Sequence, residues 1–205
     1  YDMIFRNAVK TMLLMFFLSV ALTPTLVISA PLAFEIKSGS PNLVKFTSDA
    51  PMVKIVGVTD QISGTLNFDP SDMSGSLEAE FTVDMKSLDT DNKIRNKHMR
   101  DNHLETDVFP SSSFKLRSIG DVPGGKLNHL EPVTFNAQGD FNLHGITNRI
   151  DVKITAIWDE QKKTVETVAI FDLFLASYKI PRPQFLVMKL DEKQSVEIKF
   201  TAMAE

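Results

Sequence analysis

The residues that could do chemistry are few, and two of the four histidines are the first candidates. His98 and His103 lie five positions apart, in a segment dense in charge between Asp89 and Asp107. Five steps along a helix rotate a side chain by about 140°, so a helix would point this pair apart. The zinc pattern H-E-x-x-H and the nucleophile elbow G-x-S-x-G are both missing from the sequence. The sequence therefore predicts no catalytic residue, no metal site and no cofactor.

The same segment carries a basic cluster, which consists of Arg95, Lys97, His98, Arg100 and His103. Such a cluster is either a solvated turn or a set of donors for an anionic or carbonyl head group at the mouth of a cavity. Spacing alone favours the solvated turn. His144 directly precedes Gly145, and we expect it to cap a turn rather than form a site.

The elements around these residues are predicted by a period of two in the apolar residues. From Leu77 to Met85 and from Val133 to Leu143, every second residue is apolar or small and its neighbours are polar. Successive side chains of a strand point to opposite faces, so each run predicts a strand with one apolar face. The expected strands are Leu43–Ser48, Val53–Thr59, Gln61–Phe68, Leu77–Met85, Phe114–Ile119, Val133–Leu143, Ile150–Trp158, Thr164–Leu175 and Val196–Ala202. A short helical insert is expected at about residues 91–104.

Many antiparallel strands with one apolar face predict an all-β fold, either a sandwich or a barrel. At about 3.3 Å per residue, Val133–Leu143 would be roughly 35 Å long, which suits a tilted strand in a single barrel of about eight strands. An outer-membrane barrel is disfavoured, since one Trp and two Tyr cannot form aromatic girdles. Small residues among the apolar positions either relieve crowding or leave a bore: Gly64, Ala79, Ala137, Gly139 and Ala156.

Length and charge limit the function classes. A chain of 205 residues suits one domain, and a net charge of -4 gives no sign of a nucleic-acid partner. The chain has no cysteine, which excludes disulfides, thiolate nucleophiles and cysteine-bound metals.

The N-terminus has the pattern of a secretory signal peptide. Arg6 and Lys10 precede the apolar run Met12–Leu22, and small residues follow up to Ser29. A membrane anchor is the alternative, but spanning needs about 20 apolar residues. We expect a cleaved signal peptide at residues 1–29, a lead segment at 30–41, a barrel domain at 42–205, and export to the periplasm.

Several ordered motifs resemble one family. They are Met85–Thr90 (MKSLDT), Arg95–Thr106 (RNKHMRDNHLET), Phe109-Pro110, Phe114, Gly139–Asn148 (GDFNLHGITN) and Tyr178–Ile180. Through these motifs the chain resembles the YceI-like, polyisoprenoid-binding family from about Asn42 to Ala202. The resemblance implies a lipocalin-like, eight-stranded antiparallel barrel that holds an isoprenoid lipid, such as a quinone or polyprenyl phosphate, in its lumen.

The function expected is non-catalytic binding and carriage of that lipid. Its alternatives are an enzyme that uses His98, His103 or His144, and an envelope stress or interaction protein whose barrel is a packed core. Transient contact with a membrane and dimerisation are left open. The expected lumen residues are Phe81, Val83, Met85, Phe114, Phe135, Phe141, Leu143, Phe171, Leu173 and Leu175, with the inward face of Thr164–Leu175 undecided. The expected mouth residues are Arg95, His98, Met99, Arg100, His103 and Leu104.

Overall fold

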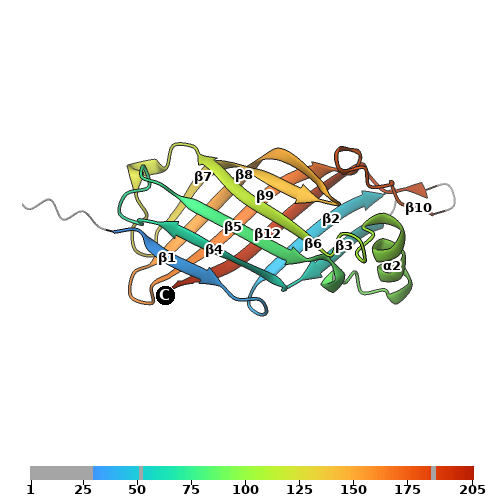
Figure 1. Ribbon diagram of the computed structural model, residues 1–205, viewed down its shortest axis with the longest axis horizontal. Coiled ribbons are helices and arrows are strands. Elements are labelled where there is room, and N and C mark those ends of the chain that lie inside the picture. The colour runs from blue at the N-terminus through green and yellow to red at the C-terminus, as the bar shows by residue number, and fades with distance from the viewer. Residues whose placement is uncertain (1–29, 51–52, 186–187) are drawn as a thin grey trace, which may run out of the picture.

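The computed structural model describes residues 30–50, 53–185 and 188–205 (Figure 1). The predicted signal peptide at residues 1–29 lies outside the described residues. Ten strands form one sheet, and they are β1 (Leu32–Ile36), β2 (Leu43–Ala50), β3 (Val53–Thr59), β4 (Ile62–Phe68), β5 (Glu78–Asp84), β6 (Ser111–Ile119), β7 (Pro132–Leu143), β8 (Ile146–Asp159), β9 (Thr164–Phe174) and β12 (Lys193–Ala204). A separate short hairpin consists of β10 (Gln184–Phe185) and β11 (Met188–Lys189).

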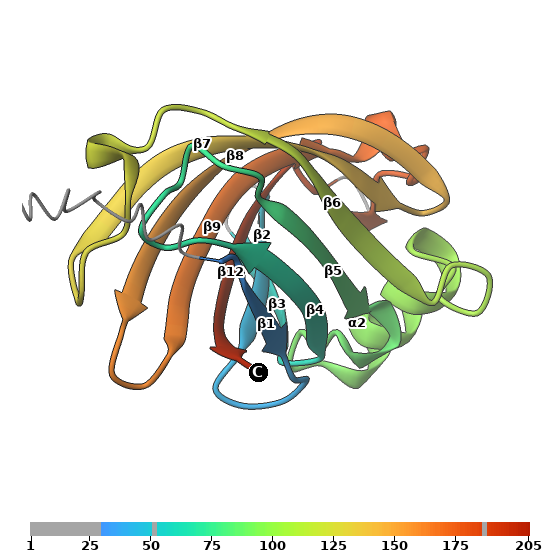
Figure 2. The same cartoon turned by 60° about the vertical axis from the view of Figure 1, so that its left-hand side comes forward.

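Eight of the strands close into an antiparallel barrel in the order β1-β4-β5-β6-β7-β8-β9-β12. The ring is closed by β1, which pairs with β4 along its whole length and with the end of β12 through Phe34 and Glu35 (Figure 2). Further along the same edge of β12, Gln194–Lys199 pairs with β2, and β3 then pairs with β2. This architecture confirms the predicted fold. The lead segment contributes β1, whose Phe34 and Ile36 are each only 1% exposed.

The helical segment lies between β5 and β6, at one end of the barrel (Figure 1). It runs through η1 (Met85–Ser87), α2 (Lys93–His98) and the π-helical turn η2 (Met99–His103). Val58 and Asp89 exchange a pair of backbone hydrogen bonds, and Met85 N donates to Pro110 O at 2.9 Å. These three bonds hold both ends of the insert against the barrel. Shorter elements elsewhere are η3 (Pro123–Gly125) and η4 (Leu175–Tyr178).

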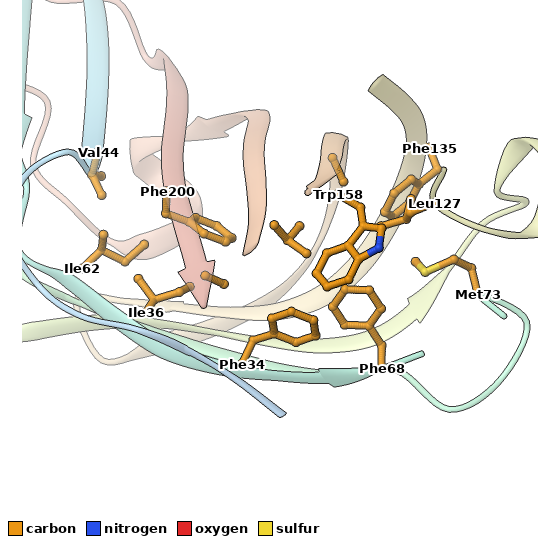
Figure 3. Close-up of a cluster of buried hydrophobic side chains, with 13 residues drawn as sticks. Phe34, Ile36, Val44, Ile62, Phe68, Met73, Leu127, Phe135, Trp158 and Phe200 are labelled. Atoms are coloured by element: carbon orange, nitrogen blue, oxygen red, sulfur yellow. The ribbon is translucent and has the colours of Figure 1, made fainter. Parts of the chain in front are cut away.

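The opposite end of the barrel is filled by a cluster of buried apolar side chains (Figure 3). At its centre the Phe34 ring stacks on Phe68 with centroids 4.9 Å apart, and the Trp158 ring meets Phe34 edge-on at 5.7 Å. Burial of large aromatic rings is among the strongest contributions to stability in such a core. A second cluster, which includes Phe171 and Tyr178, lies toward the insert.

The inward face of β9 carries Phe171 and Leu173. Phe171 and Leu173 are buried, whereas Ile170 and Phe174 are about half exposed on the outside of the barrel. Both faces of this strand carry apolar residues, so its alternation could not distinguish them. Only the pairing of β9 with β8 and β12 fixes which face is inside.

Two of the small inward residues make room for aromatic rings. A Cβ added to Gly139 would lie 2.1 Å from Cζ of Phe114, and one added to Gly64 would lie 2.6 Å from Cδ1 of Phe81. Each glycine therefore lets a phenylalanine from a neighbouring strand place its ring where a Cβ would otherwise be. At these two positions the small residues relieve crowding, and a ring covers them.

We expect Gly139→Ala to destabilise the barrel by about 1–3 kcal/mol, because the new methyl group displaces the Phe114 ring from a packed interior. Urea unfolding measures the change. Gly75→Ala is the control, since its Cβ would meet nothing closer than the carbonyl oxygen of Asp72 at 3.5 Å. Equal stabilities for the two variants would contradict this packing role.

Candidate functional site

A cavity of about 640 Å³, here called the outer chamber, occupies the end of the barrel beside the insert. Its walls are side chains of seven strands, β2, β3, β5, β6, β7, β9 and β12, together with Met85 of η1 and Leu175 of η4. Its rim is formed by the insert and by residues after η4. The lining residues from the walls are Val44, Phe46, Ile55, Val83, Met85, Ser112, Phe141, Leu143, Phe171, Leu173, Leu175, Gln194, Val196 and Ile198. A closed barrel of eight strands is just wide enough to leave such a space.

A second, smaller cavity of about 100 Å³, the inner chamber, lies deeper in the barrel. Its lining is almost wholly apolar. The two chambers share five lining residues, and these form the partition between them: Val83, Ser112, Phe141, Phe171 and Ile198. The Phe141 ring meets Phe171 edge-on at 5.3 Å, so aromatic side chains make up much of this partition.

The structure places all ten predicted lumen residues on the two chambers. Met85, Leu143, Leu173 and Leu175 line the outer chamber, and Phe81, Phe114 and Phe135 line the inner one. Val83, Phe141 and Phe171 belong to the partition. Their role in binding a ligand stays a prediction.

Five of the six predicted mouth residues line the rim of the outer chamber, and they are Arg95, His98, Met99, His103 and Leu104. Arg100 is different, because its guanidinium donates a hydrogen bond to the carbonyl oxygen of Leu88 at 2.8 Å. It supports the segment between η1 and α2, and it is not among the residues around the chamber.

The charge at the rim is one-sided. Among the described residues that line the outer chamber there is no aspartate or glutamate, while Arg95, His98 and His103 are present. Arg95 donates to Oγ1 of Thr90 at 2.8 Å and to the Thr90 carbonyl oxygen. A guanidinium has five N–H donors, so others remain for a ligand. The rim suits a carbonyl or an anion and disfavours an amine.

Asn96 holds the rim together from within the insert. The residue is only 8% exposed, and Oδ1 accepts hydrogen bonds from the backbone N–H and the hydroxyl of Thr90 at 2.8 and 2.6 Å. Its Nδ2 donates to Oδ1 of Asp89 at 2.7 Å. This bond, followed by one from the backbone N–H of Asp91, lowers the pKa of Asp89 below its ordinary value. The stability it contributes is present at neutral pH and is lost as the pH falls through the lowered pKa.

His144 joins the lip of the insert to the barrel. It occupies the β7–β8 turn with φ of 53°, followed by Gly145 with φ of 72°. Its Nδ1 lies 3.0 Å from the Tyr178 carbonyl oxygen, and its Nε2 lies 2.7 Å from Oε2 of Glu105. Phe109 packs on the ring, with centroids 4.5 Å apart. His144 is thus a turn residue, in agreement with the interpretation from sequence.

The two rim histidines, His98 and His103, are not paired with each other by any described contact. His98 is exposed, and Nδ1 of His103 lies 2.8 Å from the carbonyl oxygen of Pro181, which ties the insert to the segment after η4. Across the described residues, no group of three or more His, Asp or Glu side chains is placed to hold a metal ion. None of the helices in the described ranges is long and apolar enough to cross a membrane.

Sequence reasoning missed part of the chamber wall. Val44 and Phe46 of β2, Ile55 of β3, and Val196 and Ile198 of β12 all line the outer chamber. Their alternation was visible in the sequence and could have found them. The sequence did not show that β2 pairs with β12, and this pairing brings the apolar face of β2 to the mouth.

We expect Asn96→Ala to destabilise the protein by about 1–3 kcal/mol, because buried groups of Thr90 lose their partner. Asn102→Ala, at an exposed position of the same insert, is the matched control. Thermal or urea unfolding gives the stability, and an NMR titration gives a second readout, in which the pKa of Asp89 rises toward its ordinary value. An unchanged Asp89 titration would show that Asn96 does not hold that carboxylate.

Comparison with known proteins gives a consistent match. A family model described as the YceI-like domain matches residues 38–204. Among solved structures, a polyisoprenoid binding domain from Saccharophagus degradans, implicated in plant cell wall breakdown, aligns with a TM-score of 0.68 at 17% identity, over 85% of this chain and 99% of that one. BcnA of Burkholderia cenocepacia aligns with a TM-score of 0.65 at 16% identity, over 79% and 96% of the two chains.

A YCEI protein of Campylobacter jejuni aligns with a TM-score of 0.60 at 13% identity, over 76% of this chain and 87% of that one. No curated protein matches the chain significantly in sequence. At such identities the solved structures support the barrel fold, and the family follows from the sequence model, which spans nearly the whole described chain. The chain therefore belongs to the YceI-like domain family.

Proposed function

We propose that this protein binds a long-chain isoprenoid lipid, with the tail in the outer chamber and the head group at the rim. The observation that carries the proposal is an apolar chamber of about 640 Å³ inside a closed barrel. The structural neighbour from Saccharophagus degradans, which is named a polyisoprenoid binding domain, supports the same ligand class.

The energetics favour a carrier or store over a high-affinity trap. Burying a methylene group is worth about 0.8 kcal/mol against water, so each five-carbon isoprene unit contributes roughly 3–4 kcal/mol. A bilayer shelters the same tail nearly as well. Transfer from membrane to protein is therefore close to neutral, and the protein makes a water-insoluble chain mobile in an aqueous compartment.

The rim chemistry suggests the head group. Arg95, His98 and His103 offer donors, and no described acidic side chain lines the chamber to repel an anion. Both a quinone carbonyl and a polyprenyl phosphate fit such donors. The expected export signal at residues 1–29 would bring this carrier to the periplasm.

We propose that the binding is non-catalytic. Of the three histidines considered as acid–base groups, His144 is only 8% exposed at its side chain, does not line the chamber, and has acceptors at both ring nitrogens. His98 and His103 line the rim, but no described contact pairs either of them with a nucleophile or with a carboxylate. Turnover of an isoprenoid lipid that is lost in His98→Ala or His103→Ala would favour an enzyme instead.

The first test is a mass spectrum of what the protein retains. Mature protein expressed in bacteria and purified under native conditions should carry a long-chain isoprenoid into an organic extract. Extract from the same amount of a cytoplasmic protein of similar size is the control. Clean extracts from folded protein would contradict lipid binding.

A second test fills the chamber from one strand. Leu173→Trp should lower the retained lipid at least tenfold, because the larger ring occupies the outer chamber that Leu173 lines. Phe174→Trp is the matched control, because Phe174 is next to Leu173 on the same strand but points outward and is 50% exposed. Lipid is quantified per folded protein, with folding checked by thermal unfolding. Equal retention by both variants would place the lipid outside the barrel.

A further inference from the structure

A third cavity lies on the outside of the barrel wall, far from the rim. It is a groove of about 1070 Å³ between β5 and β6, at the end of these strands that is remote from the insert. Its surface mixes apolar side chains with serines, threonine, asparagine and charged residues. Nothing in the lipid site described above uses this groove.

The groove exists because the barrel wall is incomplete there. In the described chain, β5 and β6 pair only from Glu80 to Asp84 and from Ser111 to Lys115. β6 continues to Ile119 beside β7, with an irregularity in register between Leu116 and Ser118. Such a bulge bends a strand away from its neighbour, so the two strands part. The result is a window in the wall.

Two loops frame the window at its far side. The loop after β4 and the loop after β6 are joined by backbone hydrogen bonds, from Met73 N to Gly125 O at 2.8 Å and from Leu127 N to Pro70 O at 2.7 Å. A frame of two strands and two bonded loops keeps the opening in place. Its size is therefore set by the side chains that stand in it.

Only those side chains separate the groove from the inner chamber. The groove and the inner chamber share five lining residues, all apolar, and they are Met73, Leu77, Ala79, Leu116 and Ile119. Met73 is buried and the other four are partly buried. Met and Leu side chains are flexible enough to turn aside without a shift of the backbone. The three cavities thus lie in a row, with the partition between the first two and the window between the last two.

The volumes of the two chambers limit the length of the lipid tail that fits inside the barrel. If one carbon with its hydrogens takes roughly 30 Å³, the share of a water molecule in the liquid, the outer chamber holds about 20 carbons, or about four isoprene units. The inner chamber, at about 100 Å³, adds little. A longer tail cannot end inside the barrel, because the packed cluster around Phe34 and Trp158 fills the far end.

We infer that the lumen is a through-passage, and that the distal end of a long isoprenoid tail leaves it sideways through the window between β5 and β6. This inference rests on the proposed lipid-binding function. The apolar floor of the groove, formed by the five window residues and Val122, receives the end of the tail. Tails of about four units stay within the chambers, and longer ones depend on the window.

The experiment compares a short and a long prenyl alcohol, geranylgeraniol and solanesol, offered together in phosphatidylcholine vesicles. After separation from the vesicles, the protein-bound amount of each is measured by mass spectrometry. Ala79→Phe places a ring in the window, and Thr82→Phe adds the same ring to an exposed outward position of the same strand. Leu116→Ala removes a side chain from the window instead.

Wild type and Thr82→Phe should retain both alcohols. In Ala79→Phe the ratio of bound solanesol to bound geranylgeraniol should fall at least tenfold. Leu116→Ala should raise the ratio of long to short severalfold, and this variant decides the question if Ala79→Phe does not fold. Retention of the short alcohol alone by wild type would overturn the window and leave the lipid-binding function intact. Retention of neither would overturn both, and unchanged ratios in the folded window variants would overturn the window.

Direct placement comes from a long prenyl alcohol with a diazirine at the end of its tail. Cross-links after irradiation should fall on residues 73–79 and 116–122. Cross-links confined to the outer chamber would overturn the inference, because the tail would then fold back on itself inside the barrel.

Discussion

The structure depends on the closure of one sheet on itself, through the pairing of β1 with both β4 and β12. Once the ring is closed, every second side chain of eight strands must share a single interior whose width is set by the strand number. The aromatic rings fill that interior unevenly. Phe34, Phe68 and Trp158 pack one end solidly, whereas the end beside the insert is lined by residues that leave a chamber. Stability and binding are thereby assigned to opposite ends of the same barrel.

The glycines and phenylalanines between these ends control the depth of the lumen. Gly139 and Gly64 leave room for the rings of Phe114 and Phe81, which line the inner chamber. Phe141 and Phe171 instead project far enough to form the partition. Where the interior is closely packed, the position of a ring depends on whether the residue opposite it has a Cβ, as at Gly139 and Gly64.

The insert completes the mouth. Because it is not part of the sheet, hydrogen bonds of its side chains hold it in place. Asn96 joins Thr90 to Asp89, Arg100 reaches back to Leu88, and His144 connects Glu105 to the turn after β7. These side chains fix the backbone on which Arg95, His98 and His103 stand at the rim. In the basic cluster, then, some residues position the segment and others face the chamber. Spacing in the sequence could not separate the two groups.

The sequence by itself determined the strands, the barrel class and the alternation that sends Phe81, Phe141 and Leu143 inward, because a period of two is a local property of an extended chain. It also located the insert and five of the six residues expected at the mouth, whereas Arg100 is bonded to Leu88 behind the rim. Tertiary structure alone decided the inward face of β9, where both faces are apolar, and the contribution of β2 and β3 to the chamber. It alone revealed that β5 and β6 part below the mouth, since register between strands distant in sequence is set by the closed ring and leaves no local signal.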